Sequence, residues 1–220
     1  MSEAWWTHKR TVSVVTDTEG WFDPFAQDLV EKARENGDTA QFVRDPDQTP
    51  EGEVAFYLSC LKLTPDAVLA RNRINLVVHA SALPEGRGFS PIVWQVLEGL
   101  NDIPLSLFEM DGTADTGPIV KQSTITFKGH ELNDEIRDAL GRCVVDICMD
   151  YLKAETRPVA VAQSGDPTWY RRRKPADSEL DPHKSIAEQF QLLRVVDNER
   201  YPAFFTINGH RYTLKIAKAD

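Results

Sequence analysis

Short apolar runs recur along the first two thirds of the chain and alternate with longer stretches of helical spacing. The runs predict buried strands at residues 11–16, 41–44, 54–60, 75–79, 104–108 and 119–127. Asp23, Thr64 and Ser90 each precede a proline, a favoured way to open a helix, and apolar residues follow at helical spacing. Strands that alternate with helices in this way are typical of an α/β fold with a mostly parallel sheet flanked by helices.

A long helix is predicted over Glu131–Leu152, where apolar residues fall on one face. After it, Pro158, Gly165 and Pro167 interrupt a polar stretch, which indicates a boundary. We therefore divide the chain into a core at residues 1–160 and a small C-terminal module at residues 161–220.

The sequence of the C-terminal module contains signals for one helix and one hairpin. Ser185 and Glu188 form a capping box, which predicts a helix directly after it. Asn208-Gly209 separates two strand-like runs, Ala203–Ile207 and His210–Ile216, and is a strong hairpin signal. These elements predict an α+β module made of a helix and a β-hairpin.

Charge and cysteine content narrow the classes of partner. The formal net charge of the 220-residue chain is −9, whereas a protein that binds folded RNA needs a dense basic surface. We therefore expect no nucleic-acid partner. The basic cluster Arg171–Lys174 is large enough for a diphosphate. The cysteines Cys60, Cys143 and Cys148 lack metal-ligand spacing, so we expect buried thiols and no metal.

The apolar runs are too short to cross a bilayer, which takes about 20 residues. The N-terminus also lacks the apolar core of a signal peptide. These features predict a cytoplasmic protein without a membrane partner. The first strand-to-helix turn, at residues 17–21, has no GxGxxG pattern, so we expect no dinucleotide at that turn.

Two residues stand out as candidates for chemistry. His79 lies at the carboxyl end of a predicted strand, before the Pro/Gly-rich loop Leu83–Gly88, where open α/β sheets bind ligands. It is a candidate general base, or alternatively a histidine held by a hydrogen bond at a strand end. Asp115 lies in the glycine-containing loop Asp111–Gly117, where aspartates usually form turns, although its carboxylate could also orient an imidazole or a water.

The segment around these residues resembles a known family. His79-Ala80-Ser81, Leu83-Pro84, Gly86, Gly88, Pro91 and Trp94 are similar to the HxSLLPxxRGxxPxxW motif of folate-dependent formyltransferases. The stretch Ala114–Ile119 resembles the DxGDI/DAGAI loop that follows in that family, at the family's spacing. The resemblance covers roughly residues 54–152 and implies a Rossmann-like formyltransferase core.

The resemblance implies an enzyme that uses 10-formyltetrahydrofolate as formyl donor, with His79 and Asp115 as catalytic residues. It implies a folate pocket lined by Leu83, Pro84, Gly86, Gly88, Phe108, Met110, Asp111, Ala114 and Asp115. One position departs from the family, in which an asparagine precedes the histidine by two residues. Here that position is Val77, which cannot donate a hydrogen bond to an oxyanion. Ser81, a neighbouring side chain or backbone N–H groups could take its place.

The C-terminal module suggests the acceptor. Tyr170-Arg171-Arg172-Arg173, followed by Pro175, Asp177 and Ser178, resembles the Y-x-RR-x-P-x-D-S stretch of sugar N-formyltransferases. That resemblance implies the primary amine of a nucleotide-linked amino sugar as acceptor, as in surface-polysaccharide biosynthesis, and a homodimer. The substrate would be bound by Ser81, Arg171, Arg172 and Arg173. Alternatively, the arginines form a solvated run that clamps the module onto the core.

The sequence leaves other functions open. A glycinamide-ribonucleotide-type transformylase has a similar length but lacks a comparable tail, and a non-catalytic folate- or nucleotide-binding relative would explain Val77. Methionyl-tRNA formylation is disfavoured, because those enzymes carry a larger C-terminal barrel and a basic surface.

Overall fold

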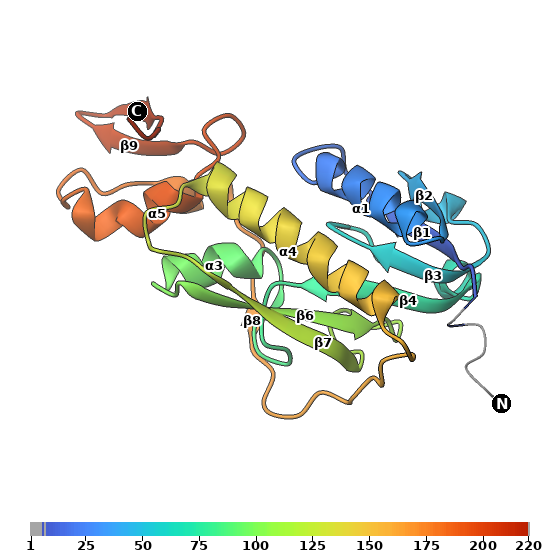
Figure 1. Cartoon of the computed structure of the whole chain (residues 1–220). Coiled ribbons are helices and arrows are strands. Elements are labelled where there is room, and N and C mark those ends of the chain that lie inside the picture. Colours follow the sequence, from blue (N-terminus) through green and yellow to red (C-terminus); the bar gives the residue numbers. More distant parts are fainter. Residues whose placement is uncertain (1–5, 7, 220) are drawn as a thin grey trace.

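A six-stranded sheet forms the centre of the molecule (Figure 1). The computed structural model describes Trp6 and residues 8–219. The strand order is β2-β1-β3-β4-β6-β7. The four strands β1 to β4 run parallel to one another, and β6 runs antiparallel to both of its neighbours, β4 and β7. The strands are Thr11–Val15 (β1), Thr39–Val43 (β2), Gly52–Tyr57 (β3), Asn72–His79 (β4), Asp102–Glu109 (β6) and Ile119–Thr126 (β7). The mostly parallel sheet predicted from the alternation is confirmed.

Two helices, α1 (Asp23–Glu35) and α4 (Asn133–Lys153), lie side by side on one face of the sheet (Figure 1). Their apolar faces join the main core with the inward residues of the strands. The helices approach closely at Gly141, because a Cβ at that position would overlap the ring of Phe25. No helix in the described part of the chain is both long and apolar enough to cross a membrane.

The opposite face of the sheet carries a smaller apolar cluster. It consists of Val15, Val43, Ala55 and Tyr57, with Cys60, Leu69, Val77 and Met110 packed against it. The helix predicted after Thr64 is only one turn long, Asp66–Leu69 (α2), and supplies Leu69. This face is thus covered by one short helix and by loop residues, and two of these, Leu69 and Met110, bind Asn75 in the middle of β4.

The chain returns to the core after α4 instead of leaving it (Figure 1). Trp169–Tyr170 (β8) pairs in parallel with Arg87–Gly88 (β5), in the loop between β4 and α3 (Pro91–Leu97). Neither two-residue strand was expected from the sequence, because such short strands show no periodicity. The division of the chain at residue 160 stays a prediction.

The C-terminal elements match the expected helix and hairpin in kind. The capping box forms, since Ser185 N donates to the Glu188 carboxylate (2.8 Å) and Glu188 N to Ser185 Oγ (3.2 Å). A 3₁₀ turn follows it, and α5 spans only Phe190–Val195. The hairpin is confirmed, with β9 at Ala203–Ile207 and β10 at His210–Leu214.

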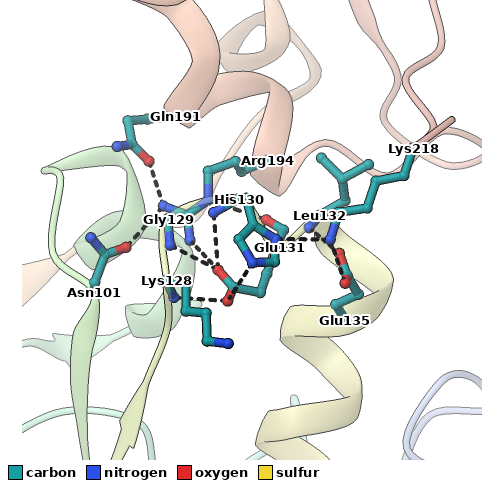
Figure 2. Close-up of polar contacts among 10 residues, drawn as sticks. All are labelled: Asn101, Lys128, Gly129, His130, Glu131, Leu132, Glu135, Gln191, Arg194 and Lys218. Atoms are coloured by element: carbon teal, nitrogen blue, oxygen red, sulfur yellow. Dashed lines mark hydrogen bonds and ion pairs between the residues drawn. The ribbon is translucent and has the colours of Figure 1, made fainter.

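A buried arginine joins the C-terminal elements to the core (Figure 2). The Arg194 side chain is fully buried and donates to the Glu131 carbonyl (3.1 Å), to Asn101 Oδ1 (3.1 Å) and to Gln191 Oε1 (2.7 Å). The Glu131 carboxylate in turn accepts backbone N–H groups of residues 128–130. α5 is thereby fixed against the loop that precedes α4.

Candidate active site

His79 is the last residue of β4 and is 8% exposed. Its Nε2 lies 2.8 Å from the carbonyl oxygen of Gly86, in the loop that follows the strand. A carbonyl oxygen can only accept a hydrogen bond, so Nε2 must carry a proton. In the neutral imidazole the lone pair is therefore on Nδ1, and this is the nitrogen able to take up a proton.

Asp115 faces that nitrogen from the loop between β6 and β7. Its Oδ1 lies 3.6 Å from His79 Nδ1, and its Oδ2 accepts the backbone N–H of Gly88 at 2.8 Å. The first distance is too long for a hydrogen bond, as expected while Nδ1 has no proton. A proton taken up there would lie opposite a carboxylate, which stabilises the imidazolium. The structure thus brings together the two residues predicted to be catalytic.

The loop that carries Asp115 is constrained by its neighbours. Asp115 has a positive φ of 59°, a conformation that aspartate tolerates better than most residues. Gly117 packs so closely against β6 that a Cβ would overlap the carbonyl oxygen of Glu109. The Asp111 carboxylate accepts the N–H of Thr113 (3.1 Å) and the hydroxyl of Thr116 (2.7 Å). The turn and the placement of Asp115 are therefore set by the same short segment.

An apolar row leads across the sheet to this site. Val15, Tyr57, Val77 and Phe108 are register partners on successive strands, so their side chains share one face. His79 follows two residues after Val77 on the same face. Val77 is half-buried and, like Met110, packs against the apolar cluster that contains Tyr57. The position of the family's asparagine is thus part of an apolar surface.

The predicted pocket residues fall into two groups. Leu83, Pro84, Gly86 and Phe108 are buried, with Gly88, Met110 and Asp115 half-buried around them, whereas Asp111 and Ala114 are exposed on the loop. Ser81 is 2% exposed, and its hydroxyl makes no hydrogen bond within the described residues. A Cβ placed on Gly86 would lie 2.9 Å from Ser81 Cβ, so this hydroxyl-bearing side chain adjoins the residue that binds His79.

The arginine run lies next to this loop but is largely engaged within the chain. Arg171 pairs with the Asp177 carboxylate (2.6 Å) and lies over the ring of Trp94. The hydrogen bond from Arg171 lowers the pKa of the Asp177 carboxyl group to about 2. Arg173 is half-buried and donates to the Asp177 carbonyl (3.1 Å). Arg172 lies over Phe89 and forms no ion pair within the described residues, so it is the freest of the three for a substrate.

Sequence reasoning missed the residues of the strap, as we term residues 161–170. Gln163 donates from its Nε2 to the carbonyl oxygens of Asp115 (3.0 Å) and Gly117 (2.9 Å). Thr168 Oγ1 accepts the N–H of Gly86 at 2.7 Å. The polar, proline-interrupted sequence predicts only a linker here, and no local pattern marks these two side chains.

The sequence of the chain matches the formyl transferase family over residues 11–144, a stretch that contains both His79 and Asp115. The chain belongs to this family.

Solved structures with the same fold include two kinds of formyltransferase and the protein HypX. Methionyl-tRNA formyltransferase from Clostridium thermocellum superposes with a TM-score of 0.78 at 23% identity, covering 96% of this chain and 93% of that one. A sugar N-formyltransferase from a Shewanella species gives 0.68 at 13% identity, covering 96% and 99%. HypX from Aquifex aeolicus in complex with tetrahydrofolic acid gives 0.74 at 14% identity, covering 95% of this chain and 38% of HypX. At these identities the likeness establishes the fold.

Proposed function

We propose that this protein is an N-formyltransferase that moves a formyl group from 10-formyltetrahydrofolate to the primary amine of a nucleotide-linked amino sugar. The observation that carries the chemistry is the pair formed by His79 Nδ1 and the Asp115 carboxylate, 3.6 Å apart. A basic nitrogen opposite a carboxylate is suited to accept a proton from an amine as it attacks a carbonyl carbon.

His79 carries the proton in both steps, and Asp115 stabilises the charged ring between them. As the amine nitrogen bonds to the formyl carbon, His79 Nδ1 takes the amine proton, and Asp115 stabilises the resulting imidazolium. When the bond between the formyl carbon and the folate nitrogen breaks, the imidazolium returns the proton to that nitrogen. The Gly86 carbonyl holds the ring by Nε2 throughout, so Nδ1 stays directed at Asp115.

The surroundings of the dyad fit a folate donor. Val77 and Met110 are half-buried on the face of the sheet that carries His79, and Phe108 continues that surface. A flat aromatic ring system bound there would cover apolar side chains that are otherwise partly exposed. The HypX structure, which shares this fold, holds tetrahydrofolic acid.

The sugar acceptor is supported by the tail and by charge. Arg172 is a cation without an ion pair within the described residues, close to β8 and thus to the loop that contacts the dyad. A guanidinium matches the oxygens of a diphosphate. The net charge of −9 disfavours a tRNA acceptor.

Methionyl-tRNA is the second candidate acceptor, because the Clostridium thermocellum enzyme has nearly the same extent as this chain. The net charge and the arginine stretch favour the sugar over this acceptor. Glycinamide ribonucleotide remains as a third.

A thermal-shift panel followed by transfer assays tests the proposal. Uridine- and thymidine-diphosphate-linked amino sugars, glycinamide ribonucleotide and methionyl-tRNA are compared, since a bound ligand raises the melting temperature. We expect a rise with one of the amino sugars and formylated sugar on adding 10-formyltetrahydrofolate. His79→Ala and Asp115→Ala should remain folded and form no product. Product from another acceptor, or turnover by either variant, would contradict the assignment, and absence of any single-turnover product would indicate a non-catalytic relative.

A further inference from the structure

The strap crosses both loops that form the candidate active site. It begins with a backbone bridge between Val161 and Ile119, directly after the Asp115 loop, with N···O distances of 2.7 and 2.8 Å. It ends in the pairing of β8 with Arg87 and Gly88, directly after the residue that binds His79. Between these two ends only Gln163 is half-buried, and the neighbouring side chains up to Trp169 are exposed.

Each partner of His79 is held by one side chain of the strap. Thr168 Oγ1 accepts the N–H of Gly86, whose own carbonyl contacts His79 Nε2. Gln163 Nε2 donates to the carbonyl of Asp115, whose carboxylate faces His79 Nδ1. Both nitrogens of the imidazole therefore meet groups whose positions are set from the strap.

Both ends of the Gln163 side-chain amide form hydrogen bonds. Its Nε2 serves two carbonyl oxygens of the Asp115 loop, and its Oε1 accepts Arg87 Nη2 at 2.6 Å. A glutamate of the same shape would keep the contact to Arg87 but could not donate to either carbonyl. Gln163 thus ties the loop of Asp115 to the loop of Gly86.

We propose that Gln163 and Thr168 are positioning residues for formyl transfer, which fix the Asp115 carboxylate and the Gly86 carbonyl on either side of the His79 ring. The proposal rests on the proposed function, in which His79 moves the proton and Asp115 stabilises the imidazolium. It gives the segment after residue 160 a part in the chemistry, beyond binding an acceptor. The strap side chains act through other groups and do not touch the reacting atoms themselves.

Substitutions that keep shape and change hydrogen bonding test this proposal. Thr168→Val removes the acceptor, Thr168→Ser retains it, and Gln163→Glu removes the donor. Ser164→Ala is the control, because Ser164 is exposed on the same strap and its side chain makes no hydrogen bond to the part of the chain that the structure describes. Thermal melting confirms that each variant is folded.

The first readout is the ¹⁵N NMR spectrum of the histidine side chains in the full chain without ligand, with His79 identified by its loss in His79→Ala. We expect the parent, Thr168→Ser and Ser164→Ala to show the tautomer with the proton on Nε2. Thr168→Val should give a mixture of both tautomers, because Gly86 is no longer fixed. In Gln163→Glu the Nδ1 resonance should shift while Nε2 keeps its proton.

The second readout is steady-state kinetics with the acceptor found in the panel. Thr168→Val and Gln163→Glu should lower kcat by about 10- to 100-fold, with the KM of the acceptor within about threefold of the parent, since small misplacements of catalytic groups cost this much. Parent-like spectra in both variants, or parent-like kcat, would overturn the positioning role. That result leaves the proposed function standing if His79→Ala is inactive, whereas an active His79→Ala overturns the function itself.

Discussion

At the scale of single residues, Val77 raises the question of which group donates a hydrogen bond to the oxyanion. Val77 lies where the motif resemblance leads us to expect an asparagine, and its side chain packs in an apolar row. Asn75 lies on the same face, but its Nδ2 already donates to the Leu69 carbonyl at 2.9 Å. Ser81 is buried beside Gly86 with a hydroxyl that makes no hydrogen bond within the described residues. Ser81 thus offers an unused hydroxyl directly beside the residue that binds His79, whereas Asn75 lies further back on β4 and is held by Leu69.

Replacing Ser81 by alanine should therefore lower kcat about 100-fold, because loss of one donor to an oxyanion typically has this effect. The KM of both substrates should change little, since the interaction forms as the carbonyl oxygen gains charge. Steady-state kinetics measure both constants. Asn75→Ala is the comparison and should keep kcat near that of the parent. A larger loss in Asn75→Ala than in Ser81→Ala would assign the missing donor to Asn75 instead.

At the scale of elements, the sequence predicted the helices, strands and turns that form through contacts between residues close together in the chain. The hairpin forms at Asn208-Gly209 because these two residues adopt positive φ, as the turn requires. The long helix and the buried strands follow from apolar spacing. The pairing of β5 with β8 joins residues about eighty positions apart, and its side-chain contacts, such as Arg87 over the ring of Trp169, leave no local pattern in the sequence. The dyad of His79 and Asp115 was predictable from its motifs. The contacts of Gln163 and Thr168 with that site were not, because they depend on the path of the strap in the folded chain.

The contact between α1 and α4 depends on the absence of one side chain. Gly141→Ala should lower the free energy of unfolding by about 1–3 kcal/mol, because the new methyl group overlaps the Phe25 ring. The same change made together with Phe25→Leu should cost much less, since the smaller side chain leaves room and alanine favours the helix. Urea unfolding of the two single variants and the double variant measures this coupling. Equal effects of Gly141→Ala in both backgrounds would show that the ring is not the cause.

At the scale of the whole molecule, the strap makes the placement of the C-terminal elements relevant to catalysis. The chain runs from α4 through the strap to α5, and Arg194 holds α5 against the core at the far end of this path (Figure 2). Burial lowers the pKa of Arg194, an effect opposed by the nearby Glu131 carboxylate. The buried guanidinium is stabilised because Glu131, Asn101 and Gln191 accept its hydrogen bonds.

Arg194→Met keeps most of the buried stem and removes the guanidinium, which leaves those acceptors without their donor. We expect the free energy of unfolding to fall by about 3 kcal/mol, with faster hydrogen exchange of the β9–β10 amides because α5 no longer anchors the hairpin. Lys218→Met is the matched control: the Lys218 side chain is 43% exposed and pairs with Glu135 at 2.6 Å (Figure 2). A screened surface pair of this kind should contribute less than about 1 kcal/mol. Urea unfolding and hydrogen exchange are measured on both variants. Equal losses in the free energy of unfolding would show that Arg194 stabilises the C-terminal elements no more than an exposed ion pair does.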